Sequence, residues 1–543
     1  MNGGEALVAT LISHGLDTGF CVPGESYLAV LEALRRERGR FRLITNRHES
    51  GATFAAEAYG KLTAKPGLAF VTRGPGATNA SIGIHAAAQD STPMVLFVGQ
   101  VPRAHRGLEA FQEIDCHTMF GNLAKAVVEP GAADEISATT SLALGLAVSG
   151  RPGPVVVVLP EDLTEGDAGA PRIVPAVERE AIEPAAEAVA EACRLVTASR
   201  YPVVISGELV AAHSAHRSLE EFVGATGAGV VTSFRRQDTF ANSHPAYLGH
   251  FGLGRASYQR RAWAECDLVI AAGSRLDSVT CENFTLFHED QKLIHIYVDD
   301  NVVGRHRQAD VALNADVGLV LDALAVGLAG SCTDDRLAWC EKFHRAYQEF
   351  AATGPPTIGA VDLASVVHTV SERLDGDHVI ANDAGNFAGW VHRCFEFRQP
   401  HSQTGPGSGA MGAGVPAAIG AQLARPEATV VAFVGDGGFQ MTGAEIATAL
   451  AEDLPIKIIV CDNGAYGTIL MHQRRQVGEE YAVRIGGPNF AALAHAHGAA
   501  AWSVNKTEDF SAAFDAALAH PGPTLIHVKT DVRDISVFGS NGC

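Results

Sequence analysis

Residues 430–467 read VVAFVGDGGFQMTGAEIATALAEDLPIKIIVCDNGAYG and follow a strand–helix–strand pattern. The opening run of apolar, β-branched residues ends in glycine, which is typical of a buried parallel strand. A helix is predicted over residues 443–452, and a second buried strand over residues 456–461. A unit of this length brings the carboxyl ends of both strands to the same edge of a sheet.

Polar residues follow both strands at that edge. The first strand leads into Gly435-Asp436-Gly437-Gly438, which we predict to be a turn whose missing side chains let backbone amides approach an anion. The second strand delivers Asp462-Asn463, with 24 residues between Gly437 and Asp462. One carboxylate, one amide oxygen and bound phosphates suit Mg²⁺. An acid–glycine turn taken alone is as often an ordinary loop as a binding site for a cation and phosphate. This hypothesis therefore depends on the rest of the chain.

The composition indicates a globular α/β protein of three or four domains. Of its 543 residues, 47% are hydrophobic, 19% are charged and 57 are glycine, which is far from a disordered or fibrous profile. The formal net charge of −20 argues against a nucleic-acid partner, because such a partner requires a basic surface.

Cysteine usage and the N-terminus bear on the compartment. Ten cysteines are scattered singly, with no C-x-x-C pair, so disulfide, zinc and iron–sulfur frameworks are not expected. The first residues, MNGGEALVATLISHGL, lack the basic region and cleavage pattern of a signal peptide. No apolar stretch has the length needed to cross a bilayer. We therefore expect a cytoplasmic protein that has no membrane partner.

Strand and helix patterns alternate along the chain, which predicts parallel sheets covered by helices on both faces. They divide the chain into three α/β domains, at residues 1–165, 186–330 and 358–543. Residues 166–185, rich in Pro, Ala and Glu, form a predicted linker. A second linker is predicted over residues 331–357, with a charged helix and Gly354-Pro355-Pro356. In the first domain a helix is predicted over residues 51–64 and a loop over residues 73–79.

Five motifs in sequence carry a family resemblance: RHESGATFAAEAYGKLT, TRGPGATNASIG, AFQEID, GAMGAGVPAAIGAQLA and GDGGFQMTGAEIATAL…CDNG. With them the chain resembles the thiamine-diphosphate (ThDP)-dependent 2-oxoacid decarboxylases and carboligases, most closely the acetolactate (acetohydroxyacid) synthase large-subunit group. The resemblance implies an N-terminal pyrimidine-binding domain, a central domain and a C-terminal diphosphate-binding domain. ThDP would lie between the first domain of one subunit and the third of another, which implies a homodimer or homotetramer.

The resemblance also implies roles for individual residues. Glu49 would hydrogen-bond ring atom N1′ of the cofactor's pyrimidine, Met411 would be the wedge that bends the cofactor, and Gln112 would reach the reacting carbon. Glu49 could instead merely cap the helix that follows it, and a lone Met is usually a core gap-filler. The implied cofactor-binding residues are Pro23, Gly24, Pro75, Gly76, Asn79, Gly385, Asn386, Phe387, Gly409, Met411, Gly435, Asp436, Gly437, Gly438, Asn463 and Ala465. Mg²⁺ would be held by Asp436, Asn463 and the backbone oxygen of Ala465.

Departures from the family pattern concern the cofactor and the substrate. Gly385-Asn386-Phe387 stands where the family has Gly-Gln-His, and Phe387 cannot replace the hydrogen bond of a histidine. His472 stands where acetolactate synthases carry a tryptophan that favours a larger acceptor. An arginine that helps to hold the acceptor is missing after Arg275-Leu276-Asp277-Ser278-Val279. Ser26, Phe111 and His472 are candidates for the substrate pocket.

The central domain of this family binds FAD, ADP or nothing. Residues 248–254, LGHFGLG, stand where FAD-binding relatives have a glycine-rich loop. No full dinucleotide fingerprint follows a strand, so the question of FAD or ADP stays open at this stage.

The implied activity is that of a ThDP- and Mg²⁺-dependent lyase or transferase. It would decarboxylate a pyruvate-like 2-oxo acid and ligate the resulting enamine to a carbonyl acceptor, as acetolactate synthase does. Three alternatives are a non-ligating decarboxylase of the benzoylformate type, an acyl-CoA or aldehyde lyase, and an inactive cofactor-binding partner subunit. A nucleotide-dependent dehydrogenase is disfavoured because no G-x-G-x-x-G follows the first strand.

Overall fold

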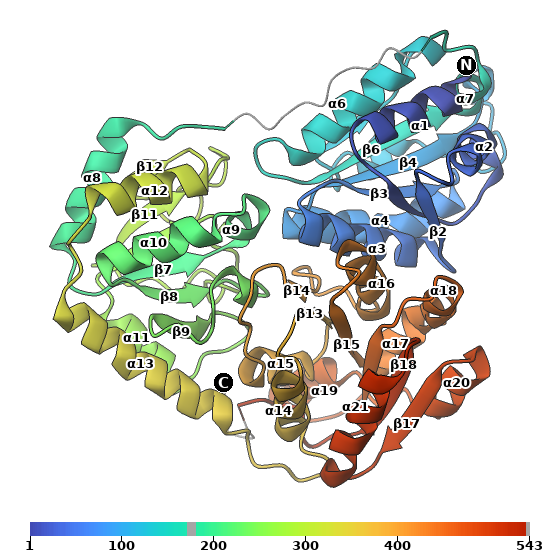
Figure 1. The fold of residues 1–543 in the computed structure, drawn as a ribbon. Coiled ribbons are helices and arrows are strands. Elements are labelled where there is room, and N and C mark those ends of the chain that lie inside the picture. Colours follow the sequence, from blue (N-terminus) through green and yellow to red (C-terminus); the bar gives the residue numbers. More distant parts are fainter. Residues whose placement is uncertain (171–180, 539–543) are drawn as a thin grey trace.

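The computed structural model describes residues 1–170 and 181–538 and contains three units, each built on a six-stranded sheet (Figure 1). Every strand pairing within the sheets is parallel. The predicted fold class, three parallel-sheet α/β domains, is confirmed. Runs of Val, Ile and Ala account for it, because the strands of such sheets are buried on both faces.

The first unit has the strand order β2-β1-β3-β4-β6-β5. Its strands are β1 (Thr18–Cys21), β2 (Arg42–Thr45), β3 (Gly67–Val71), β4 (Met94–Gln100), β5 (Ala126–Val128) and β6 (Pro154–Pro160). Its helices are α1 (Gly3–Ser13), α2 (Leu28–Arg36), α3 (Glu49–Thr63), α4 (Pro75–Asp90), α5 (Cys116–Phe120), α6 (Ile136–Val148) and α7 (Glu161–Glu165).

The third unit repeats the plan of the first. Its order, β14-β13-β15-β16-β18-β17, matches that of the first sheet strand for strand, with β13 in the place of β1 and β14 in the place of β2. Its strands are β13 (His378–Asn382), β14 (Gln403–Thr404), β15 (Thr429–Gly435), β16 (Lys457–Asp462), β17 (Ala500–Val504) and β18 (Thr524–Lys529). Its helices are α14 (Leu363–Arg373), α15 (Ala388–Cys394), α16 (Gly414–Ala424), α17 (Asp436–Thr442), α18 (Ile446–Ala451), α19 (Gly467–Gln476), α20 (Phe490–His497) and α21 (Phe510–Ala519).

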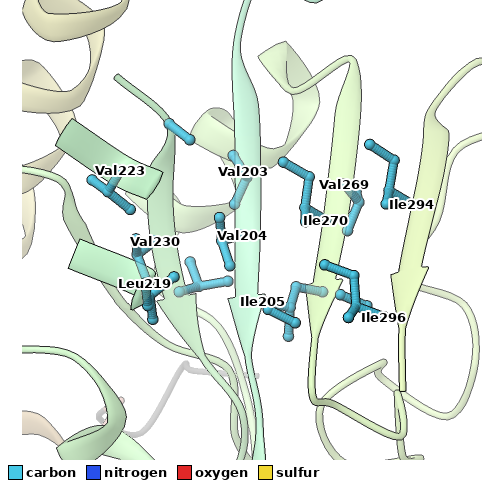
Figure 2. Packing of buried hydrophobic residues seen from close by; sticks show 14 of the residues in the cluster. Val203, Val204, Ile205, Leu219, Val223, Val230, Val269, Ile270, Ile294 and Ile296 are labelled. Carbon is cyan, nitrogen blue, oxygen red and sulfur yellow. The ribbon is translucent and has the colours of Figure 1, made fainter. Parts of the chain in front are cut away.

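The middle unit has a different order, β12-β11-β10-β7-β8-β9, with its first strand in the centre, as in dinucleotide-binding sheets. Figure 2 shows the apolar side chains of β7, β10 and β11 and, beside β8, Leu219 and Val223 of α10. The strands are β7 (Pro202–Ser206), β8 (Gly229–Thr232), β9 (Tyr247–His250), β10 (Leu268–Ala272), β11 (Lys292–Ile296) and β12 (Val311–Leu313). The helices are α8 (Ala186–Ala198), α9 (Glu208–Ala212), α10 (His216–Thr226), α11 (Ser257–Glu265), α12 (Val317–Gly327) and α13 (Asp334–Ala352).

Helices α3 and α16 join the first and third units (Figure 1). Small residues on both helices, including Ala55 and Gly420, allow the two backbones to approach closely. A Cβ atom on Gly420 would lie only 2.1 Å from the carbonyl oxygen of Ala55. The absence of a side chain at Gly420 therefore permits the contact, and the two units share one hydrophobic core cluster.

Two segments differ from the sequence-based expectation. The charged helix expected in the second linker is α13, whose Trp339 and Phe343 belong to the core of the middle unit. The glycine-rich loop expected over residues 248–254 begins inside β9, which pairs with β8 across an irregular register. Of the first predicted linker, residues 171–180 lie outside the described residues. In the part of the chain that is described, no helix has the length and apolarity to span a membrane.

Candidate active site

The segment Gly435-Asp436-Gly437-Gly438 starts a helix rather than forming a separate turn. β15 ends at Gly435, α17 begins at Asp436, and the helix predicted over residues 443–452 is represented by a 3₁₀ turn and α18. The prediction was wrong because glycines read as helix breakers, whereas here packing requires them. A Cβ atom on Gly438 would lie 2.5 Å from Asp383 Oδ2, and one on Gly437 would lie 2.7 Å from the Tyr466 ring.

Asp436 stands at the end of β15, next to the polar end of β16. The pairing of the two strands sets Gly435 beside Cys461. Asp436 Oδ2 accepts a hydrogen bond from the backbone N–H of Gly464 at 2.8 Å. Burial, followed by the nearby carboxylate of Asp462, raises the pKa of Asp436 to about 6. A cation at this position would relieve both effects.

Asp462 is occupied by protein partners. Its Oδ2 accepts from His527 Nε2 at 2.7 Å and from Lys529 Nζ at 2.5 Å, and its Oδ1 accepts from the N–H of Gly464 at 3.0 Å. Burial acts to raise the pKa of Asp462, but the hydrogen bonds from His527 and Lys529 outweigh it and lower the pKa to about 2. Asp462 is therefore an ionised group that holds the strand end.

Asp436, Asn463 and Ala465 carry oxygen donors at the same sheet edge, where β15 and β16 end side by side. Asn463 Oδ1 accepts from the backbone N–H of Ala465 at 3.0 Å, so the turn is closed on itself. Among the described residues, no group of three or more His, Cys, Asp or Glu side chains is placed to hold a metal ion. A cation at this edge would thus depend on one carboxylate together with amide and backbone oxygens, the donors that Mg²⁺ accepts.

A cavity of about 540 Å³ opens at this edge between the third and middle units. Its walls include the predicted cofactor-binding residues Gly385, Asn386, Phe387, Gly409, Met411, Gly435, Asp436, Gly437, Gly438, Asn463 and Ala465. His472, on α19, also lines the cavity and is exposed. All the predicted residues of the diphosphate side are therefore brought together.

Gly385, Asn386 and Phe387 form the side of the cavity next to the C-terminal segment. The Asn386 amide donates to the carbonyl of Ile535 and accepts from the Thr468 hydroxyl, so it is turned toward protein partners. The Phe387 ring covers the chain at Gly435, where a Cβ atom would lie 2.9 Å from the ring. This wall is consequently apolar where a histidine would offer a hydrogen-bond donor.

Glu49 lies at the carboxyl edge of the first sheet, in the first turn of α3. The capping residue is His48, whose Nδ1 accepts from the N–H of Ser50 at 3.1 Å, so Glu49 does not act as the cap. Glu49 is 9% exposed, and its Oε2 accepts from Asn79 Nδ2 at 2.9 Å. The other carboxylate oxygen has no protein hydrogen-bond partner among the described residues.

The remaining pyrimidine-side residues follow β1 and β3 at the carboxyl edge of the first sheet, the edge at which Glu49 lies. The loop predicted over residues 73–79 is short, because α4 begins at Pro75, whose fixed φ suits the first position of a helix. A Cβ atom on Gly76 would lie 3.5 Å from Glu49 Oε1, and one on Gly24 would lie 2.4 Å from Thr72. Pro23 precedes Gly24 at the end of β1. Within the sequence-predicted set, Gly76 and Asn79 therefore lie next to the Glu49 carboxylate, and Pro23, Gly24 and Pro75 follow the same two strands.

The segment with Phe111 and Gln112 is held beside this set by Arg73. Arg73 Nε donates to the Phe111 carbonyl at 3.0 Å, and Gln112 adopts a left-handed φ of 63° against Gly74. The Phe111 side chain is 71% exposed. Ser26 differs from the expectation: it has no exposed surface, and its hydroxyl contacts that of Thr72 at 2.8 Å. Ser26 therefore supports the loop, and its place in a substrate pocket stays a prediction.

The two halves of the site are separate within one chain. No residue of the first unit lines the 540 Å³ cavity, while Glu49, Asn79 and Gln112 all belong to that unit.

Comparison with known proteins accounts for this divided arrangement. Residues 1–119 match the N-terminal TPP-binding domain of thiamine pyrophosphate enzymes, residues 189–324 their central domain and residues 383–528 their C-terminal TPP-binding domain. The chain is 32% identical to the acetolactate synthase isozyme 2 large subunit of Escherichia coli, over 98% of this chain and 96% of that protein. The chain belongs to the thiamine pyrophosphate enzymes, in the acetolactate synthase large-subunit family. The resemblance drawn from the motifs is confirmed.

Two further relatives are also similar to nearly the whole chain. The acetolactate synthase large subunit of Parasynechococcus marenigrum is 32% identical over 97% of this chain and 87% of that protein. The acetolactate synthase of Mycobacterium bovis is 31% identical over 94% of this chain and 84% of that protein. The first and third units of this thiamine pyrophosphate enzyme are therefore its two cofactor-binding domains.

Several residues of the cavity in this thiamine pyrophosphate enzyme were not predicted from sequence. Phe234, Arg235 and His250 of the middle unit form one wall, and residues 535–538 form another. Arg393 fixes the latter by donating to the carbonyl of Val537 at 2.5 Å. The only sequence signal for the middle-unit wall is that these residues follow β8 or end β9. The C-terminal segment carries no recognisable motif.

Proposed function

We propose that the protein is a ThDP- and Mg²⁺-dependent enzyme that decarboxylates a pyruvate-like 2-oxo acid and joins the remaining carbon unit to a carbonyl acceptor. One observation carries the proposal: the oxygen donors Asp436, Asn463 and Ala465 share a single cavity with Gly409 and Met411. Relatives named acetolactate synthase, similar over nearly the whole chain, support the same reaction class.

The residues present fit the cofactor and its metal. Asp436, Asn463 and the Ala465 carbonyl would hold Mg²⁺, and the glycines at 437 and 438 leave no side chain where a diphosphate would approach. When bound, ThDP supplies the stabilisation of a carbanion that decarboxylation of a 2-oxo acid requires. Met411 would pack against the bound cofactor, and the Gly409 carbonyl would accept a hydrogen bond from its 4′-amino group.

Glu49 would exchange a proton with pyrimidine atom N1′. Two observations support this role: its carboxylate is nearly buried, and Asn79 engages only one of its two oxygens. A positioned carboxyl group of this kind transfers protons efficiently when its geometry is fixed, and Asn79 supplies that restraint. Gln112, held in its left-handed conformation beside Gly74, would point its amide toward the reacting carbon.

A product assay tests the reaction class. Purified protein is incubated with pyruvate, ThDP and Mg²⁺, with and without a second 2-oxo acid or an aldehyde as acceptor. We expect carbon dioxide together with a ligated hydroxyketone or hydroxyketoacid. Release of free aldehyde without any ligated product would support the non-ligating decarboxylase instead, and absence of turnover of every 2-oxo acid would overturn the proposal.

A second copy of the chain would complete the site, so we propose a homodimer or a higher homo-oligomer. Exposed apolar side chains occur in both cofactor-binding units: Phe111 is 71% exposed in the first, and Met441 and Ile469 are 51% and 52% exposed in the third. Docking of the first unit of one copy on the third unit of another would cover these side chains and bring Glu49 to the cavity.

Subunit complementation tests this arrangement. Glu49→Gln and Asp436→Ala chains, each inactive alone, are co-expressed with different tags and purified as mixed dimers. If the site is shared between copies, each mixed dimer contains one intact site and one doubly altered site, so about half of the wild-type activity returns. If Glu49 and Asp436 act within one chain, the mixed dimers stay inactive.

The middle unit does not fit a nucleotide diphosphate at its sheet edge, although FAD or ADP was an open question from sequence. In sheets of this order the diphosphate lies at the first strand–helix junction, which here is the end of β7. Glu208 begins α9 at that junction, is buried, and binds Arg275 at 2.8 Å and the Tyr297 hydroxyl at 2.9 Å. Because the buried pair of Glu208 and Arg275 already occupies this junction, we propose that this edge carries no FAD or ADP. Absorbance and chromatography of the ligands released from purified protein test it, and stoichiometric flavin or ADP would contradict it.

A further inference from the structure

The loop 405–412 carries two residues of the proposed cofactor site, Gly409 and Met411, and is rich in glycine. Few bonds within the loop restrain it: the N–H of Gly409 donates to the carbonyl of Pro406 at 3.1 Å, and that of Ala410 to the Ser408 hydroxyl at 3.4 Å. Glycine backbones lose much conformational freedom when ordered. The conformation that places Met411 in the cavity must therefore be fixed from outside the loop.

The first unit restrains the start of the loop. Asp90, the last residue of α4, accepts from the N–H of Gly407 through Oδ2 at 2.9 Å. Its Oδ1 accepts from Arg236 Nη2 of the middle unit at 2.7 Å. Lys61 of α3 lies 3.5 Å from the same Oδ1 and also donates to the Gly405 carbonyl at 3.2 Å. All three side chains are largely buried, so solvent screens these contacts little.

Asp383, at the end of β13, restrains the other end of the loop. Its Oδ2 accepts from the N–H of Gly412 at 3.1 Å and its Oδ1 from that of Ala413 at 3.2 Å. Arg235 of the middle unit fixes this strand end, because its guanidinium donates to the carbonyl of Asp383 at 2.8 Å. Asp383 is fully buried.

We propose that Asp90 and Asp383 are positioning residues that hold loop 405–412, and with it Met411, in the conformation required for cofactor activation. Neither carboxylate reaches the reacting atoms; each acts on the backbone of the loop. All three units supply residues that restrain the loop, so the arrangement of the domains is coupled to the position of Met411. The inference rests on the proposed function for the role of Met411, and on the structure alone for the restraint of the loop.

The restraint is tested by amide hydrogen exchange in the full-length protein without added ThDP or Mg²⁺. The peptide spanning residues 405–413 is compared in wild type, Asp90→Asn and Asp383→Asn. A hydrogen bond to a charged group contributes enough for its loss to speed exchange roughly tenfold to a hundredfold. The matched control is Glu452→Gln, which removes the cross-unit ion pair with Arg42 (2.9 Å) and leaves the loop untouched. Unchanged exchange in both aspartate variants would overturn the proposal.

The consequence for activation is measured on the protein loaded with ThDP and Mg²⁺. Exchange of the cofactor C2 proton for deuterium, followed by NMR, should slow by about tenfold or more in both variants, while the Kd of ThDP changes little. A merely structural defect would weaken ThDP binding and lower the melting temperature together. If Asp90→Asn does not fold, Asp383→Asn tests the other end of the loop, and Lys61→Met tests the bond to Gly405. If the cofactor C2 proton does not exchange in the wild type, the proposed function is refuted. Amide hydrogen exchange of residues 405–413 then remains the test of whether the two aspartates restrain the loop.

Discussion

Asp436 and Asp462 lie at the ends of neighbouring strands of one sheet, and the pKa values of their carboxylates are shifted in opposite directions. Burial and Asp462 itself raise the pKa of Asp436 to about 6, whereas His527 and Lys529 overcome burial and lower the pKa of Asp462 to about 2. Two acidic residues at one sheet edge therefore have separate tasks. Asp462 is paired with His527 and Lys529, whereas no ion pair of Asp436 is found among the described residues, so under the proposed function a bound cation would neutralise it.

Replacement of Asp436 by Asn should abolish cation binding, and replacement of Asp462 by Asn should not. Asp436 lines the cavity, whereas the carboxylate of Asp462 is held by His527 and Lys529. We expect a loss of at least about a hundredfold in Mn²⁺ affinity for Asp436→Asn in the presence of ThDP, measured by calorimetric titration. Asp462→Asn is the matched control, and a loss of equal size there would show that both carboxylates bind the metal.

Glu49→Gln should abolish activation of the cofactor while leaving its binding nearly intact. Gln keeps the size of the side chain but cannot exchange a proton with N1′. We expect the rate of C2-proton exchange and kcat to fall by about a hundredfold or more, with little change in the Kd of ThDP. Asn79→Ala, which frees the Glu49 carboxylate, should give a smaller loss; full exchange in Glu49→Gln would contradict the assigned role.

Gly420→Ala should destabilise the contact between the first and third units. The added Cβ would meet the Ala55 carbonyl at 2.1 Å, and two packed helices would have to separate. Overpacking of this kind costs about 1–3 kcal/mol of unfolding free energy, measurable by thermal or urea unfolding. Gly224→Ala on α10 is the matched control: a Cβ there meets nothing within 4 Å, so stability should hold or rise. Equal stability of the two variants would show that the α3–α16 approach is not tight.

The buried Glu57 should make stability depend on pH. Burial raises its pKa to about 7, an effect that Lys61 only partly offsets, while Thr92 donates to its Oε1 at 2.8 Å. Because the folded-state pKa lies above the ordinary value of 4.5, this group's contribution is fully present below pH 4.5 and is lost as the pH rises through about 7. Glu57→Gln has no charge to bury, so its stability relative to wild type should increase by up to about 3 kcal/mol between pH 4.5 and pH 8. Urea unfolding at both pH values measures it, and a constant difference would contradict the raised pKa.

Local patterns predicted the strands and the domain plan well, and the starts of several helices poorly. Runs of valine and isoleucine such as those of β6 and β15 favour buried strands, and the strand expected at the start of residues 430–467 is β15. Helices that begin at Asp436 and Pro75 were read as loops, since glycine and proline usually interrupt helices. Here close packing against Asp383 and Tyr466 requires the glycines, and that requirement is tertiary.

The candidate site was predictable where motifs mark it and not where distant segments meet. Glu49 and Asp436 stand in recognisable motifs, so sequence sufficed to find them. Asp90 and Gly407 are 317 positions apart and are joined by a hydrogen bond that no local pattern encodes. Likewise, the full burial of Ser26 depends on how β1 and β3 pack together.

The shared strand order of the first and third sheets has a consequence for the origin of the site. Helix α3 follows β2 and helix α16 follows β14, so the two helices occupy equivalent places in their units and pack against each other. Such a self-complementary contact normally joins identical subunits, and here it joins two halves of a single polypeptide. The chain thus has the construction of a fused dimer whose halves have specialised. Under the proposed function, Glu49 in one half would exchange the proton and Asp436 in the other half would bind the cation.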